Sequence, residues 1–384
     1  MSDVFLLDIT GRFPQYTFKL FNELTKNNLT NKSVYLGAIN QNCDKINDSR
    51  LRLCEFNYLK KRRRKRGKFD SILKLIELSM NVSLIIYYIL TRRPRQVHLQ
   101  YLPFISTIPL FDYAFLKFTN LINIRTILTV HNILPHDSGL RFYTRYKNAY
   151  SMVNHLIVHT EEGKSKLIED FQINSNRITV IPHGIIELDP SEEVTTNFDK
   201  FAEMGTVLLF FGGLAPYKGI ERIINFAKRN ELSDTVFLIM GLGNDGYFSS
   251  LKNLLGEKPR TKVILLNKYL SDSELSTIMD VSSAVLFPYE KITFSGAVIT
   301  AMTKGKLVIC SDLVEFESLV SNGYDGLLVD WQNDMEVLRA IDLIKNDGDR
   351  CRVMGERAKE KVYASYNWRR VSQLTMKVYD LKCI

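Results

Sequence analysis

The chain has 384 residues, of which 45% are hydrophobic and 24% charged, and 51 Lys and Arg outweigh 42 Asp and Glu for a net charge of +9. The length suits two domains of about 150 to 200 residues, each large enough for its own core. The cysteines lack metal-binding spacing and close pairs, which predicts free thiols in a reducing compartment. They are Cys43, Cys54, Cys310, Cys351 and Cys383.

The first half of the chain is predicted to alternate strands with helices. A helix is expected at 18–24, and apolar runs predict strands at 4–8, 33–36, 96–100, 124–130, 156–159 and 178–181. Polar residues follow the strand ends, with Gly11 and Arg12 after the first strand and Asn132 after the fourth. Because ligands of such sheets bind at the carboxyl ends of the strands, we expect a binding site there.

His131 directly follows a very apolar strand and is our candidate catalytic histidine. An imidazole at a strand end can donate a hydrogen bond to a substrate hydroxyl or hold a reacting group. The alternative is a structural histidine that satisfies a backbone carbonyl. His159 and His183 fit strand-end or interdomain positions, and His98 is predicted to be structural.

Basic charge is concentrated in the first half, where residues 1–190 hold 27 Lys and Arg against 16 Asp and Glu. The densest run, 60–68, precedes an apolar stretch that ends at residue 90. A polybasic segment beside an amphipathic helix predicts docking on an anionic membrane surface. The apolar stretch is expected to be too short to span a bilayer, which needs about 20 apolar residues.

Two alternatives for this segment remain open. The apolar stretch could be a buried helix of the first domain, with the basic run forming a solvated loop. A basic cluster can also bind nucleic acid, but the neighbours here are aliphatic and form no stacking platform, so we expect no nucleic-acid partner. The amino terminus enters a strand without a preceding basic region, so we expect no signal peptide.

The second half predicts a doubly wound parallel sheet. Strands are expected at 206–211, 236–240, 262–266, 281–287 and 306–310, alternating with helices. The helix after the third of these strands should be capped at Ser271 or Asp272, with Glu274 completing a capping box. A polar linker near 187–197 is expected to separate the two domains.

The first strand of this half runs into a glycine-rich turn that delivers Lys218 at a helix start. The lysine charge would add to the partial positive charge of the helix amino terminus, an arrangement suited to a diphosphate. The alternative is an ordinary turn between strand and helix with a surface lysine. Further along, Ser295 to Val298 open a helix whose backbone N–H groups could hold phosphates.

The order of Pro-Tyr-Lys-Gly-Ile, Gly-Leu-Gly, Leu-Phe-Pro-Tyr, Ser-Gly-Ala-Val and Gly-Tyr-Asp-Gly-Leu-Leu-Val resembles the donor domain of GT-B glycosyltransferases, most closely retaining family 4, also called group 1. The likeness extends over 206–380, and fainter matches extend it through most of the chain. It implies an α/β fold of two Rossmann-like doubly wound domains facing a central cleft. The expected domains are an acceptor-binding domain at 1–188 with a membrane-docking segment at 60–90, a donor-binding domain at 198–365, and a closing helix at 366–384 that packs back on the first domain.

Together with the basic segment and the free thiols, the resemblance leads us to expect a peripheral cytoplasmic enzyme on the inner face of the membrane. It would move a hexose from a nucleotide sugar to a lipid-linked or polysaccharide glycan, with retention of anomeric configuration. His131 and Lys218 are the expected catalytic residues, and Lys218 would stabilise charge on the leaving diphosphate. Acceptor binding is expected at Gly11, Arg12, Tyr16, Asn132 and Asp137. Donor binding is expected at Gly212, Gly213, Lys218, Gly219, Gly241, Lys268, Tyr269, Leu270, Ser295, Gly296, Ala297, Val298 and Glu317.

Several family features are replaced in this sequence. Aligning Thr300-Ala301-Met302 with the family's Glu-Ala-Met puts Ile292 and Thr300 where the family has two glutamates, and Glu290 is out of register. Gly213 replaces an arginine of the phosphate loop. The sequence lacks an Asp-x-Asp motif after a strand, so we expect no metal or other cofactor. The alternatives are an inactive GT-B subunit that binds glycan or a partner transferase, and a sugar epimerase, which the basic docking face disfavours.

Overall fold

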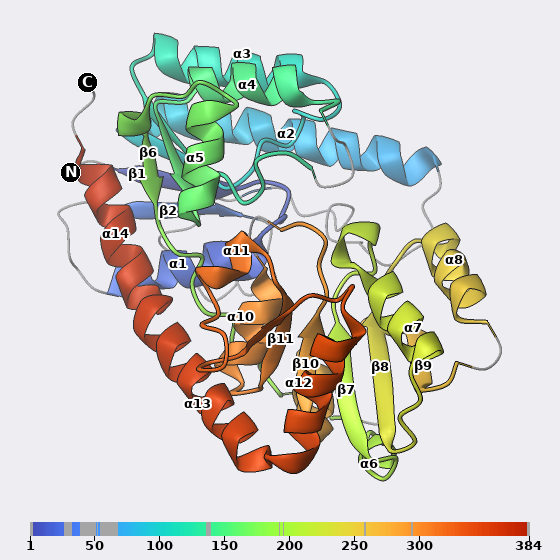
Figure 1. Ribbon diagram of the computed structural model, residues 1–384. Helices are drawn as coiled ribbons and strands as arrows, with labels where there is room; N and C mark the ends of the chain where they lie inside the picture. The colour runs from blue at the N-terminus through green and yellow to red at the C-terminus, as the bar shows by residue number, and fades with distance from the viewer. Residues whose placement is uncertain are drawn as a thin grey trace. The chain divides into compact units, whose positions relative to one another are not determined.

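The computed structural model describes residues 3–26, 33–38, 51, 53, 68–135, 140–191, 193–194, 196–256, 259–292 and 295–381. The chain divides into two compact units, one of residues 1–184 with 368–384 and the other of residues 185–367. Each unit contains one six-stranded sheet, and the strand pairs are parallel. Helices flank both sheets (Figure 1). The predicted α/β class with two doubly wound sheets is confirmed.

The first sheet has the strand order β2-β1-β3-β4-β5-β6. Every residue of β1 is buried, which is why this strand is a continuous apolar run up to its last residue. The chain moves outward from β1 to β2 and then returns to β3 on the other side of β1, so this sheet has its switch point between β1 and β3. The strands are β1 Val4–Asp8, β2 Val34–Ala38, β3 Gln96–Leu99, β4 Arg125–Thr129, β5 His155–Val158 and β6 Ile178–Val180.

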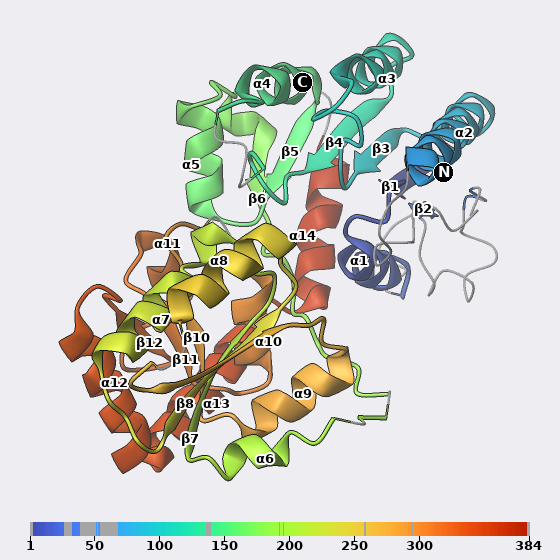
Figure 2. The same ribbon diagram turned by 90° about the vertical axis from the view of Figure 1, so that its right-hand side faces the viewer.

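Helices cover both faces of the first sheet (Figure 1, Figure 2). The face that carries α2 to α5 shares one apolar core with Phe5, Leu7 and Val97 of the strands. On the other face α1 packs beside α14, and the hydroxyl of Tyr379 in α14 lies 2.7 Å from Nδ1 of His98 in β3. These helices are α1 Pro14–Lys26, α2 Lys68–Arg92, α3 Pro109–Leu121, α4 Tyr143–Met152, α5 Glu161–Glu169 and α14 Trp368–Asp380.

Helix α2 is amphipathic. Leu78, Ile85 and Ile89 lie in the core of the first unit, whereas Ile76 and Tyr87 on another face are at least half exposed. By length and composition, Leu75–Arg92 is the one described helix that would also suffice to cross a membrane, although a core helix of a soluble protein passes the same test. The argument that this stretch is too short to span a bilayer is therefore wrong. The basic run at 60–67 lies outside the described residues.

The second sheet has the order β12-β11-β10-β7-β8-β9, so its switch point lies between β7 and β10. Ser271 and Glu274 form the predicted capping box at the start of α9. The strands are β7 Thr206–Phe211, β8 Thr235–Gly241, β9 Lys262–Asn267, β10 Ala284–Phe287, β11 Val308–Ser311 and β12 Leu327–Val329. The helices are α6 Asp199–Ala202, α7 Ile220–Arg229, α8 Asp245–Leu255, α9 Asp272–Val281, α10 Gly296–Thr303, α11 Val314–Glu317, α12 Asp334–Asn346 and α13 Gly348–Ser365.

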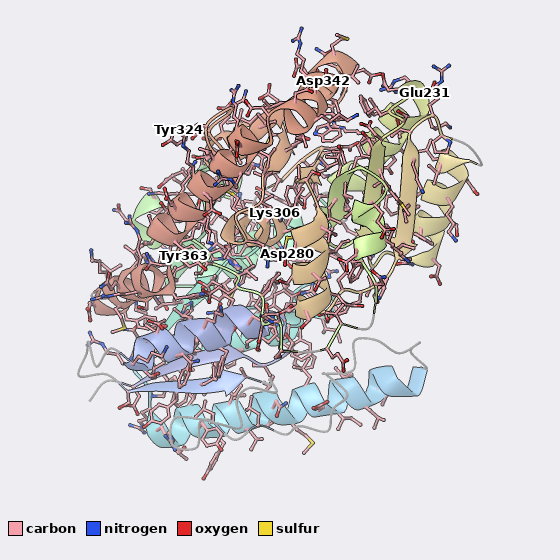
Figure 3. The ribbon with its side chains drawn as sticks, turned by 90° about the horizontal axis from the view of Figure 1, so that it is seen from below. Glu231, Asp280, Lys306, Tyr324, Asp342 and Tyr363 are labelled. Carbon is pink, nitrogen blue, oxygen red and sulfur yellow. The ribbon has the colours of Figure 1, made fainter. Side chains whose placement is uncertain are left out.

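Two strands of the second sheet begin later than predicted. Val281 is the last residue of α9, and β10 starts only at Ala284. Lys306 stands before β11, where its ammonium group donates to the carbonyl oxygens of Asp280 and Ser282 (Figure 3). It therefore ties the segment before β10 to the segment before β11.

Candidate functional site

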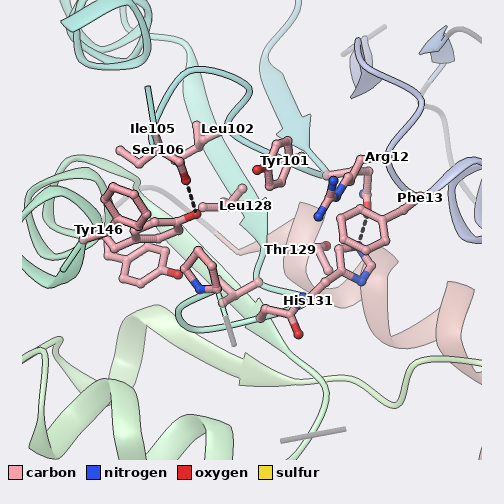
Figure 4. Close-up of a pocket in the computed structure, with 16 residues that line it drawn as sticks. Arg12, Phe13, Tyr101, Leu102, Ile105, Ser106, Leu128, Thr129, His131 and Tyr146 are labelled. Atoms are coloured by element: carbon pink, nitrogen blue, oxygen red, sulfur yellow. Dashed lines mark hydrogen bonds between the residues drawn. The ribbon is translucent and has the colours of Figure 1, made fainter. Parts of the chain in front are cut away.

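A cavity of about 260 Å³ opens at the switch point of the first sheet (Figure 4). Its walls come from the turns after β1, β3 and β4 and from α4. Aromatic rings dominate the lining, and Arg12 is the only residue with a formal charge among the described lining residues. The aromatic members are Phe13, Tyr101, His131, Phe142, Tyr146 and Tyr150.

The turn after β1 is held by the buried carboxylate of Asp8. This side chain accepts hydrogen bonds from the backbone N–H groups of Arg12 and Phe13 at 2.9 and 2.8 Å and from the hydroxyl of Thr17 at 3.4 Å. Gly11 adopts a left-handed conformation with φ of 56°, which favours glycine at this bend. Sequence reasoning missed Asp8. The available signal was an acidic residue at the last position of a buried strand.

The expected acceptor-binding residues have different positions. The exposed side chains of Arg12 and Asn132 line the cavity, and the guanidinium of Arg12 lies 5.5 Å from the ring centroid of Tyr101. Gly11 shapes the turn. Tyr16 is buried and packs on histidine rings and on Trp368, so it supports the wall from behind. Asp137 lies outside the described residues.

His131 contacts protein groups through both of its ring nitrogens. Nε2 lies 3.2 Å from Oε1 of Gln100, and Nδ1 lies 3.1 Å from Nε2 of His159. Burial lowers the pKa of His131 well below its ordinary value, and His159 and His183 add to this shift. Burial also lowers the pKa of His159 to about 4 and that of His183 to about 3. These imidazoles are therefore neutral near pH 7.

His98, which was predicted to be structural, is buried. Its Nδ1 contacts the hydroxyl of Tyr379 and its Nε2 lies 2.7 Å from the hydroxyl of Thr129. Burial lowers its pKa to about 3. His98 joins β3, β4 and α14 through these contacts.

The second unit places Lys218 at its own switch point, in the turn that follows β7. A Cβ atom on Gly212 would lie 3.0 Å from Nζ of Lys218, so the ammonium group sits beside the Gly212 backbone. The same nitrogen lies 5.3 Å from the ring centroid of Tyr289, which follows β10. Burial lowers the pKa of Lys218 to about 8. This lysine is the cation that the sequence predicted at the strand ends.

Gly219 of this loop and Gly241 at the end of β8 are required to be glycine by close backbone contacts. A Cβ atom on Gly219 would lie 1.9 Å from the carbonyl oxygen of Pro288, and one on Gly241 would lie 1.6 Å from that of Gly212. Gly219 also has φ of 64°, in the left-handed region. Gly213 meets no such contact, since its nearest neighbour would be the Leu242 carbonyl oxygen at 3.7 Å.

Helix α10 begins close to this loop. Ser295 caps it by accepting from the N–H of Val298 at 3.4 Å, and its hydroxyl lies 3.3 Å from that of Tyr289. Tyr289 therefore contacts both Lys218 and the cap of α10. The predicted phosphate-binding segment, Ser295 to Val298, and Lys218 thus meet around one buried tyrosine.

Of the remaining predicted donor residues, Lys268 to Leu270 follow β9 and Glu317 ends α11. The N–H of Lys268 donates to the carbonyl oxygen of Gly241, and its ammonium group pairs with Glu274 at 2.5 Å. Tyr269 is about half exposed, and Leu270 follows it. Glu317 is exposed at the end of α11.

The positions aligned with the two family glutamates hold buried side chains without carboxylates. Ile292 is 6% exposed and Thr300 is 5% exposed. The hydroxyl of Thr300 donates to the carbonyl oxygen of Gly296, within α10. Glu290 is exposed, and its N–H donates to the carbonyl oxygen of Tyr217. Neither buried position therefore supplies a carboxylate.

Two family descriptions match this chain. Residues 193–361 match "Glycosyl transferases group 1" and residues 75–187 match "Glycosyltransferase Family 4". An uncharacterized glycosyltransferase of Methanocaldococcus jannaschii is 24% identical over 241 residues, which are 61% of this chain and 60% of the relative. The O-antigen chain mannosyltransferase RfbU of Salmonella typhimurium is 26% identical over 203 residues, 51% of this chain and 54% of RfbU. The chain thus spans little more than half the length of these two relatives.

Solved structures share the fold over nearly the whole chain. HepE of Anabaena, solved with UDP and glucose, has a TM-score of 0.68 at 14% identity and covers 99% of both chains. Sucrose-phosphate synthase of Thermosynechococcus elongatus has a TM-score of 0.69 at 16% identity and covers 99% of this chain and 98% of that one. At these identities the likeness establishes the fold.

Proposed function

Since the chain is a GT-B glycosyltransferase with a group 1 domain and a family 4 domain, we propose that it transfers a hexose from a nucleotide sugar to a lipid-linked or polysaccharide glycan. We further propose that transfer is metal-independent and retains the anomeric configuration. The observation that carries the proposal is the position of Lys218 beside the Gly212 backbone and close to Tyr289, which contacts the cap of α10.

The donor diphosphate is assigned to this cluster because the leaving group gains negative charge as the glycosidic bond breaks. A fixed cation and backbone N–H donors stabilise that charge most strongly where water is scarce. Lys218 supplies the cation, and the amino terminus of α10 supplies a favourable dipole. The loop of Lys268 to Leu270 is proposed to bind the base, and Glu317 the ribose.

The acceptor is assigned to the cavity of the first unit. Its aromatic walls suit the apolar faces of a sugar ring, and Arg12 suits an anionic group on the acceptor. His131 lies in the wall between these features and is proposed to hold the reacting face of the acceptor. A phosphate that links glycan to lipid could accept hydrogen bonds from the guanidinium of Arg12.

A peripheral position on the cytoplasmic face of a membrane is proposed from the surface of α2. The exposed apolar residues of this helix are Ile72, Leu75, Ile76, Met80, Tyr87 and Leu90. The helix follows the basic run at 60–67 directly in the sequence. Apolar side chains would enter the headgroup boundary, and basic ones would be attracted to anionic lipid.

The second candidate is a catalytically inactive subunit that binds glycan or a partner transferase. It is favoured by the buried Ile292 and Thr300, which leave no carboxylate at the two aligned positions. Lys218 and its loop favour the active enzyme, because an inactive subunit has no need of a half-buried cation near a helix amino terminus.

Thermal-shift and calorimetric titrations with UDP, GDP, ADP and their common sugar conjugates in EDTA test the proposal. Stabilisation by one nucleotide diphosphate would support the donor site and identify the base, since stabilisation follows affinity. Hydrolysis or transfer of the matching sugar would then separate the active enzyme from the inactive subunit. The absence of any shift would favour the inactive subunit.

A further inference from the structure

Three neighbouring strands of the first sheet each deliver a histidine at their carboxyl ends. His131 follows β4, His159 follows β5, and His183 follows β6, and these strands lie side by side in the sheet. One ring nitrogen of each histidine lies within 4.8 Å of the corresponding nitrogen of the other two. His131 and His159 are buried and His183 is half-buried.

The second nitrogen of each ring faces an oxygen that can only accept a hydrogen bond. Nδ1 of His159 lies 3.0 Å from the carbonyl oxygen of Ile181, and Nδ1 of His183 lies 3.2 Å from that of Gly184. Nε2 of His131 lies 3.2 Å from Oε1 of Gln100. These nitrogens therefore carry the protons of the neutral rings, which leaves lone pairs on Nδ1 of His131 and on Nε2 nitrogens of His159 and His183.

Two of these nitrogens lie close together. Nδ1 of His131 and Nε2 of His159 lie 3.1 Å apart, a distance at which two acceptors repel unless a proton or a metal ion lies between them. Two ligand nitrogens of a tetrahedral zinc ion, with bonds of about 2.0 to 2.1 Å, lie roughly 3.3 Å apart. The spacing of the pair already suits a metal ion.

We propose that His131, His159 and His183 together bind one divalent transition-metal ion, with Zn²⁺ as the best match to three neutral imidazoles. Metal-bound histidines usually donate their other N–H to a carbonyl or carboxylate, and here Gln100, Ile181 and Gly184 supply these acceptors. Three histidines leave a further coordination position, which water would fill. This site is in the first unit and is separate from the diphosphate loop, whose proposed chemistry needs no metal.

The surroundings of the cluster restrict how its rings can move. Phe13 stacks on His131 with centroids 3.7 Å apart, and Tyr16 contacts all three histidine rings. Such packing holds ligands in a fixed orientation before the metal arrives, which favours binding. A bound ion would in turn fix His131 in the wall of the cavity.

The test uses the untagged full chain, stripped of metal with EDTA and then titrated with Zn²⁺ by calorimetry and with Co²⁺ by optical absorption. One metal per chain is expected, and Co²⁺ should give the strong visible bands of a tetrahedral nitrogen-rich site. Failure of both ions to bind would overturn the proposal. His131 would then donate a hydrogen bond to His159, with the amide of Gln100 rotated.

Variants locate the ion. Gln100→Leu removes the acceptor that orients His131 and is expected to weaken Zn²⁺ affinity by roughly 10- to 100-fold. His183→Ala removes the most exposed ligand itself and is expected to weaken Zn²⁺ affinity further. His155→Gln is the matched control, because His155 is buried in the same sheet but bonds to Thr179 outside the cluster. Equal Zn²⁺ affinity in wild type and His183→Ala would overturn the proposal. His159→Gln provides a second variant if His183→Ala does not fold.

Discussion

The ring of Phe13 stacks on the imidazole of His131, with centroids 3.7 Å apart and planes inclined by 20°. The contact joins the turn after β1 to the end of β4 across the switch point of the first sheet. The carboxylate of Asp8 holds the same turn by accepting a hydrogen bond from the N–H of Phe13. The position of His131 therefore depends on a buried carboxylate that is remote from it in the sequence.

His131→Ala should lower turnover by about 100-fold or more while sparing nucleotide affinity, because its proposed role concerns the acceptor and positioned groups of this kind contribute about 10² to 10⁴. Steady-state kinetics with calorimetry of nucleotide binding measures both quantities. Phe13→Leu is the companion variant, since it keeps the imidazole and removes only the stacking. An equal loss of nucleotide affinity would place His131 on the donor side.

Lys218→Ala should weaken binding of the nucleotide diphosphate by about 1.5 to 3 kcal/mol, the range for a desolvated hydrogen bond to a charged group. Because burial lowers the pKa of Lys218 to about 8, wild-type affinity should fall as the pH rises through this value. Calorimetric titrations between pH 7 and 9.5 measure this. The arginine of Lys218→Arg stays charged over this pH range. The nucleotide affinity of this variant should therefore not fall between pH 7 and 9.5, even if it differs from that of the wild type.

The protein should lose stability in mild acid because of its buried histidines. Burial lowers the pKa of His98 to about 3 and that of His155 to about 4, both from 6.5. The unfolded chain therefore binds more protons below pH 6.5, and the free energy of unfolding falls as the pH falls. At pH 5 each group should cost about 2 kcal/mol relative to pH 8. Urea midpoints at the two pH values measure this, and His155→Gln should show a smaller decrease than wild type.

Asp8→Ala should lower the free energy of unfolding by about 1 to 3 kcal/mol, because the partly buried backbone N–H groups of Arg12 and Phe13 would lose their acceptor. Urea denaturation measures the change. Asp8→Asn keeps one acceptor oxygen and should cost less. Equal losses in the two variants would show that the charge, rather than the hydrogen bonds, stabilises the turn.

Replacing Ile76, Tyr87 and Leu90 by serine should reduce co-sedimentation with anionic vesicles at physiological salt. These side chains are exposed on α2, so the change should leave the core of the first unit intact. Neutralising Arg62, Arg63, Arg64 and Lys65 should have the same effect through the loss of electrostatic attraction, each charge contributing about 1 kcal/mol.

The matched control for the charge change neutralises four exposed lysines of the second unit, Lys200, Lys228, Lys252 and Lys262. This variant loses as much charge but keeps the basic run and α2, so its vesicle binding should change little. Unchanged co-sedimentation of the α2 and basic-run variants would exclude docking through this surface.

The sequence by itself determined most of the strands and their order along the chain. Buried strands read as continuous apolar runs, so β1 and β7 were predicted to the residue, and the capping box at Ser271 and Glu274 follows from local chemistry alone. The late start of β10 shows the limit of such predictions. An apolar residue such as Val281 fits the end of a helix as well as the start of a strand. Lys218 was found for the same local reason, as a cation between a buried strand and a helix.

Tertiary structure decided which distant residues meet. His131, His159 and His183 stand far apart in the sequence, and only the neighbouring positions of β4, β5 and β6 bring their rings together. Asp8 and Tyr16 were not recognised as supports of the cavity wall because hydrogen bonding and ring packing depend on three-dimensional distance. The spacing of apolar residues along the chain predicts which side chains are buried. A site depends instead on which strand ends lie side by side in the sheet.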